Sequence, residues 1–104
     1  MPDQEQINEL VRRIVDAVHP LRIILFGSAV RGQMEPWSDV DILVVMPDGT
    51  HRRHTAMKLY SRMSGIPFPV DIIVATPRDL DKYKDRIGLV YRHILREGKE
   101  IYAA

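Results

Sequence analysis

The sequence contains no cysteine, which excludes disulfide bonds, thiolate zinc sites and cysteine nucleophiles together. No apolar run approaches the ~18 residues that a membrane-spanning helix needs, and the opening segment MPDQEQINEL is too polar for a signal peptide. Neither sign of charge dominates, because 15 Lys and Arg residues accompany 14 Asp and Glu residues. We therefore expect no membrane association, and no direct nucleic-acid binding driven by bulk positive charge.

What is present is enough hydrophobic material for one core. The chain has 104 residues, of which 45% are hydrophobic, so intrinsic disorder is not indicated. We expect one soluble, cytoplasmic domain spanning residues 1–104. A domain of this size has little room for both an active site and a large substrate-recognition module.

The spacing of apolar residues predicts helices and strands in alternation. An amphipathic helix is expected over 3–18 with Asp3 as its N-cap, and a short helix is expected to start at Ser28. Thr76 and Pro77 are typical of a further helix start. Helices are predicted at 3–18, 28–32, 51–64 and 76–98 (broken near Gly88), and strands at 21–26, 38–46, 69–75 and 99–102. This order predicts an α/β (α+β) fold, with helices packed on a small sheet.

Two aspartates occupy the second predicted strand against local propensity. Asp39 and Asp41 are two residues apart, so both project from one face, roughly 6.5–7 Å apart along the strand. Val40, Ile42 and Val44 take the opposite face, which we expect to be buried. Adjacent carboxylates repel each other and strand interiors disfavour Asp, so a divalent cation is the simplest compensation.

Asp71 repeats this pattern in the third predicted strand, PVDIIVA. If the second and third strands are neighbours, Asp71 joins Asp39 and Asp41 on one surface. Three carboxylates there could hold two metal ions, an arrangement used for in-line phosphoryl or nucleotidyl displacement.

A possible phosphate site precedes the aspartates. Gly27 and Ser28 follow a buried strand and open a short helix, where free backbone N–H groups can bind phosphate oxygens. Arg31, one turn later, could neutralise phosphate charge. Each feature alone also has an ordinary explanation, because Gly-Ser is often a simple turn and isolated strand aspartates often protect a solvated edge.

In combination, these residues resemble a family signature. Leu25-Phe26-Gly27-Ser28, then Arg31-Gly32, then Ser38-Asp39-Val40-Asp41-Ile42 and later Val70-Asp71-Ile72 are similar to the motifs of the DNA-polymerase-β-like nucleotidyltransferase superfamily. The resemblance spans residues 7–102 and is nearest to the minimal nucleotidyltransferase (MNT) group, in which the catalytic domain stands alone. It implies a nucleotidyltransferase-type fold with a small mixed sheet.

The resemblance also implies a role for each matching residue. Gly27 and Ser28, with Arg31 beside them, would bind the nucleoside triphosphate, with ATP as the expected substrate. Asp39 and Asp41 would bind two Mg²⁺ ions. Asp71 would complete the second metal site and help to activate the acceptor hydroxyl, as ligand or as general base.

Members of this group are often paired with a HEPN-domain toxin, which the MNT protein counteracts as antitoxin, in some cases by transferring AMP to a tyrosine. The resemblance therefore implies transfer of a nucleoside monophosphate to a hydroxyl on a partner protein. Two alternatives stay open: a non-catalytic antitoxin that acts by binding its partner, and a homo-oligomeric (dimeric) nucleotidyltransferase acting on a small molecule. The sequence does not identify the nucleotide or the acceptor.

The predicted helix over 51–64 carries several further residues of interest. Met57, Tyr60 and Met63 share one side, and the two methionines are expected to pack in the core. His51 and His54, together with Lys58 and Arg62, indicate a solvated basic end that could meet an acidic partner or nucleotide phosphates. Outside this helix, Trp37 precedes the Asp pair and could stack on a base or anchor an interface.

Overall fold

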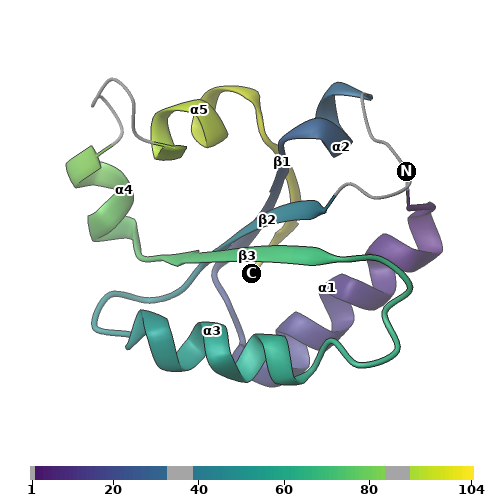
Figure 1. The fold of residues 1–104 in the computed structure, drawn as a ribbon. Coiled ribbons are helices and arrows are strands. Elements are labelled where there is room, and N and C mark those ends of the chain that lie inside the picture. The colour runs from purple at the N-terminus through teal and green to yellow at the C-terminus, as the bar shows by residue number, and fades with distance from the viewer. Residues whose placement is uncertain (1, 33–38, 84–89) are drawn as a thin grey trace.

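The computed structural model describes residues 2–32, 39–83 and 90–104, and it places helices on both faces of one four-stranded sheet (Figure 1). The elements are α1 (Gln4–Val18), β1 (Arg22–Phe26), α2 (Ser28–Arg31), β2 (Val40–Val45), α3 (Arg52–Ser61), β3 (Val70–Ala75), α4 (Pro77–Tyr83), α5 (Val90–Glu97) and β4 (Lys99–Ala103). The predicted break near Gly88 and the predicted loop containing Trp37 lie outside the described residues.

The sheet is mixed, with strand order β3-β2-β1-β4. β1 runs antiparallel to both β2 and β4, whereas β2 and β3 are parallel neighbours. A parallel pair needs a crossover, and α3 supplies it. The second and third strands are therefore adjacent, which is the condition for bringing Asp71 to the other aspartates, and the predicted small mixed sheet is confirmed.

Alternating side chains on the strands bury both faces of the sheet. Figure 1 shows α1 and α3 on one face and α4 and α5 on the other. Val40, Ile42 and Val44 are fully buried on the α1/α3 face, as predicted, while Leu43 and Val45 are buried on the α4/α5 face. β2 is consequently buried on both faces along most of its length, and its charged residue, Asp41, lies near its start.

Two helices begin at the N-cap residues that the sequence predicts. Asp3 caps α1 by accepting from the Gln6 N–H at 2.8 Å, and the Gln6 side chain accepts in return from the Asp3 N–H at 3.0 Å. Thr76 and Asp79 form a similar reciprocal pair at the start of α4. These caps confirm the two helix starts predicted from Asp3 and Thr76.

Helix α3 differs most from its prediction. It ends at Ser61 rather than at residue 64, and its N-cap is His51, whose Nδ1 accepts from the His54 N–H at 3.2 Å. Met57 is 61% exposed, so its assignment to the core was wrong, and Tyr60 is 46% exposed. Leu59 is instead the buried residue of α3, because the helix presents the Thr55–Ala56–Leu59 side to the sheet.

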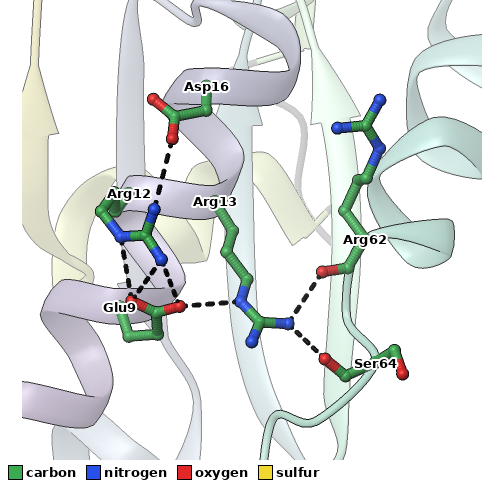
Figure 2. A network of polar contacts seen from close by, with 6 residues as sticks. All are labelled: Glu9, Arg12, Arg13, Asp16, Arg62 and Ser64. Atoms are coloured by element: carbon green, nitrogen blue, oxygen red, sulfur yellow. Dashed lines mark hydrogen bonds and ion pairs between the residues drawn. The ribbon is translucent and has the colours of Figure 1, made fainter.

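A polar network fastens the end of α3 to α1 (Figure 2). Glu9 accepts from both Arg12 and Arg13 on its own helix. Arg13 then donates to the carbonyl oxygens of Arg62, at 3.1 Å, and Ser64. The chain leaving α3 is therefore held by a side chain of α1.

Within the described part of the chain, no helix has both the length and the apolar character to cross a membrane.

Candidate active site

The predicted site residues gather where three strand ends meet. Asp41 is the register partner of Phe26, the last residue of β1, and of Asp71 near the start of β3. Because β2 and β3 are parallel and in register, Asp41 and Asp71 project from the same face of the sheet. The helix α2 begins directly after β1 and packs on β1 and β2 at this end.

Gly27 lies directly beneath the Asp41 carboxylate. Its backbone has φ +73° and ψ −149°, a combination that only glycine adopts without strain. A Cβ at this position would collide with Oδ2 of Asp41 and would lie 3.2 Å from its Cγ. Gly27, which we expected to allow close approach of its backbone, is therefore contacted by the Asp41 carboxylate. The sequence alone did not indicate this contact.

The electrostatics of Asp41 reflect this crowding. Burial raises the pKa of the Asp41 carboxyl, and the negative charges of Asp71 and Asp39 raise it further. Arg31 opposes these effects by lowering the pKa. The site therefore concentrates negative charge at a partly desolvated position, and a cation bound there would relieve the repulsion.

The remaining predicted residues border this centre. Asp39 is exposed and stands just before β2, so it is not part of the strand to which it was assigned. Ser28 is half-buried as the first residue of α2, and Arg31 is the exposed last residue of that helix. Gly27, Ser28 and Arg31 thus belong to one turn beside Asp41.

One residue at the site was missed by the sequence analysis. The Tyr60 hydroxyl lies 3.3 Å from Oδ1 of Asp71, and it accepts a hydrogen bond of 2.8 Å from the Ile72 N–H. Burial raises the pKa of Tyr60, and although the Ile72 hydrogen bond acts in the opposite direction, Asp71 and Asp39 raise it again. The hydroxyl therefore stays protonated and available as a donor. A helix-spacing argument placed Tyr60 with the methionines, and only the path of α3 along β3 brings it to Asp71.

The carboxylate pair has the chemistry of a magnesium site. Mg²⁺ prefers hard oxygen ligands and is usually held by one or two carboxylates together with substrate phosphates and water. Asp41 and Asp71 supply two such carboxylates, and exposed Asp39 stands beside them. No group of three or more acidic or histidine side chains that could by itself hold a metal ion occurs among residues 2–32, 39–83 and 90–104. The donor set fits an ion whose coordination is completed by a phosphate ligand.

Comparison with known proteins identifies the family. The family described as "Nucleotidyltransferase domain" matches residues 5–101. This chain belongs to the nucleotidyltransferase domain family. The match includes Gly27, Ser28, Arg31 and all three aspartates. A search of the curated proteins finds no match.

Solved structures share the nucleotidyltransferase fold. A "putative nucleotidyltransferase" from Sulfolobus solfataricus aligns over 95% of this chain and 78% of its own, with a TM-score of 0.62 and 22% identity. A toxin-antitoxin structure with AMP-PNP aligns over 99% of this chain and 75% of its own, with a TM-score of 0.61 and 24% identity. A mutant of the MntA-HpeT toxin-antitoxin aligns over 100% of this chain and 75% of its own, with a TM-score of 0.57 and 22% identity.

These likenesses confirm the fold class predicted from the sequence.

Proposed function

We propose that this nucleotidyltransferase uses Mg²⁺ to transfer AMP from ATP to a hydroxyl group of a partner protein, and that it serves as the antitoxin of a HEPN-domain toxin. The observation that carries the proposal is the in-register pair Asp41 and Asp71 at the end of the sheet, with Gly27 against the Asp41 carboxylate. Family membership supports the reaction type. The AMP-PNP complex of a structurally similar toxin-antitoxin supports an adenine nucleotide and a toxin partner.

Different residues would bind the nucleotide and the metal ions. Gly27 and Ser28 would bind the triphosphate at the start of α2, with the Arg31 charge nearby. Asp39, Asp41 and Asp71 would hold two Mg²⁺ ions, which supply charge neutralisation at the phosphates when bound.

In the transfer, the acceptor hydroxyl oxygen forms a bond to the α-phosphorus of ATP, and the bond between this phosphorus and the bridging oxygen to the β-phosphorus breaks. Pyrophosphate leaves with that bond's electron pair. The hydroxyl proton passes to the carboxylate of Asp71, which is exposed at the edge of the site. The products are pyrophosphate and a protein carrying AMP through a phosphodiester bond.

The decisive experiment is transfer of label from α-³²P-ATP to the toxin co-purified with this chain, with MgCl₂ present. The wild type should label the toxin, and the double variant Asp39→Asn/Asp41→Asn should not. Labelling that persists in the double variant would show that the aspartates do not perform the reaction.

The same variant separates catalysis from blockade. If antitoxin action needs transfer, co-expression of Asp39→Asn/Asp41→Asn with the toxin should leave cells unprotected although the two proteins still co-purify. Full protection by a variant without transfer activity would favour the non-catalytic antitoxin. Labelling of a small hydroxyl compound by the chain alone would favour the small-molecule enzyme.

A further inference from the structure

One segment of this protein is basic because it contains no acidic residue. Residues 49–70 contain four Lys and Arg residues and two histidines but no Asp or Glu. The rest of the chain has 11 basic and 14 acidic residues, a net charge of −3. This segment is therefore more basic than the chain as a whole, and α3 lies at its centre.

The basic side chains of α3 are exposed and largely without acidic partners. In the described structure, no carboxylate forms an ion pair with Arg53, Lys58 or Arg62, and all three residues are exposed. Arg52 of the same helix, by contrast, pairs with Asp79, and Arg12 and Arg13 of α1 both pair with Glu9. Unpaired charges of one sign on a single helix create a field that an oppositely charged partner would satisfy.

This surface leads directly to the catalytic aspartates. Arg53, Met57 and Tyr60 follow an i, i+4, i+7 spacing and therefore lie along one side of α3. Tyr60 is the residue of this side that reaches Asp71. Met57, 61% exposed, adds an apolar contact between the charges. A partner bound along α3 would thus have part of its chain beside the site.

We propose that the α3 surface, formed by Arg53, Met57 and Lys58, docks an acidic segment of the protein that carries the acceptor hydroxyl. This inference rests on the proposed function and adds the chemistry of the partner. Charge complementarity would speed encounter and orient the segment, and Met57 would contribute an apolar contact.

One observation favours an acidic protein over RNA as the occupant. Base stacking, on which single-stranded nucleic-acid binding depends, needs free aromatic faces. Tyr60 is the one Phe, Tyr or Trp residue of α3, and its hydroxyl is engaged with Asp71 and Ile72.

The test uses full-length protein and two random copolymers, one of glutamate with tyrosine and one of lysine with tyrosine. Both offer tyrosine hydroxyls, and they differ in charge. A charge-reversal variant, Arg53→Glu/Lys58→Glu, is compared with a matched control, Arg78→Glu/Lys82→Glu, which makes the same charge change on α4 across the sheet. All four side chains are exposed, so both variants should fold, and circular dichroism and melting temperature verify this.

Binding is measured first, by fluorescence anisotropy of labelled copolymer without nucleotide. The wild type should bind the glutamate copolymer more tightly than the lysine copolymer. Arg53→Glu/Lys58→Glu should weaken that binding by about tenfold or more, equal to about 1.4 kcal/mol, and the control should change it by less than about twofold. Equal weakening by both variants, or no preference for the acidic copolymer, would overturn the inference.

Transfer from α-³²P-ATP with Mg²⁺ then separates this inference from the proposed function. We expect the α3 variant to raise KM for the glutamate copolymer while kcat stays unchanged. Charge-dependent binding without any labelling of copolymer or co-purified toxin would leave the docking surface standing and overturn the proposed function. Labelling that does not respond to copolymer charge would support the proposed function and overturn the docking surface. Tighter binding of a labelled oligoadenylate RNA than of the acidic copolymer, lost in the α3 variant, would replace the acidic protein by nucleic acid.

Discussion

The hydroxyl of Tyr60 joins helix α3 to Asp71 around the open edge of β3. It accepts from the Ile72 N–H at 2.8 Å, and its single proton has two acceptors, Oδ1 of Asp71 at 3.3 Å and the Ile72 carbonyl oxygen at 3.5 Å. The contact satisfies a backbone group that β2 cannot reach, and it restrains the Asp71 carboxylate. A residue on one face of the sheet therefore influences a carboxylate on the other.

We expect Tyr60→Phe to slow transfer without weakening nucleotide binding. Loss of the hydroxyl frees the Asp71 carboxylate to rotate, which should lower kcat by about three- to tenfold and leave KM for ATP unchanged. Because Tyr60 is half-exposed, water can replace its hydrogen bond to Ile72, and the free energy of unfolding should fall by about 1 kcal/mol or less. Steady-state kinetics and thermal unfolding measure both effects. Tyr102→Phe on β4 is the control, and an equal kcat in the two variants would contradict the prediction.

Gly27→Ala should remove activity and destabilise the fold. The new Cβ would collide with the Asp41 carboxylate, and the backbone conformation is itself strained for alanine. We expect a loss of about 2 kcal/mol or more in the free energy of unfolding. Gly32→Ala is a matched control, because its φ is also positive, at +69°, but nothing lies within 4 Å of its Cβ. It should cost only about 1–2 kcal/mol of backbone strain and retain transfer. Chemical denaturation distinguishes the two, and equal losses would show that the contact with Asp41 has no energetic effect.

Asp41→Asn should stabilise the metal-free protein while abolishing transfer. Burial, Asp71 and Asp39 raise the pKa of Asp41 in the folded state above its unfolded value. Stability is therefore lost as pH rises through the folded pKa, and the neutral amide avoids this loss. At pH 7 we expect the melting temperature of Asp41→Asn to lie above that of the wild type. The gain should vanish below about pH 4, where wild-type Asp41 is protonated.

With nucleotide and metal present, the wild type should become more stable than the variants that lack the site carboxylates. Mg²⁺ with a non-hydrolysable ATP analogue should raise the melting temperature of the wild type, because ligand binds only the folded state. Asp39→Asn/Asp41→Asn should show little response, and EDTA should remove the wild-type shift. A comparable shift in the double variant would place the metal elsewhere.

Arg13→Ala should loosen the end of α3, whereas Arg12→Ala should not. Both side chains pair with Glu9, but only Arg13, 26% exposed, also donates to the carbonyl oxygens of Arg62 and Ser64. We expect Arg13→Ala to cost about 1–3 kcal/mol, and Arg12→Ala, 62% exposed, less than about 0.5 kcal/mol. Amide hydrogen exchange over residues 59–66 should quicken in Arg13→Ala alone. Unchanged exchange would show that other contacts hold this segment.

Local patterns in the chain were sufficient to predict most elements. Asp3 and Thr76 cap helices because their side chains bond to backbone only three residues away, and the alternation of Val40, Ile42 and Val44 predicts one buried face of β2. The assignment of Asp39 to this strand failed because strand ends depend on pairing, and β2 begins at Val40 where its pairing with β3 begins.

The sequence by itself determined that costly aspartates stand in otherwise hydrophobic strands, and that Gly27 and Ser28 interrupt the chain between a strand and a helix. Those facts follow from composition and spacing, which a linear pattern records. Only the tertiary structure decided that Asp41 and Asp71 are register partners, that Gly27 lies under Asp41, and that Tyr60 reaches Asp71. Such contacts depend on strand order and on the path of α3 beside β3. They are set by the packing of the whole sheet and not by any local stretch of residues.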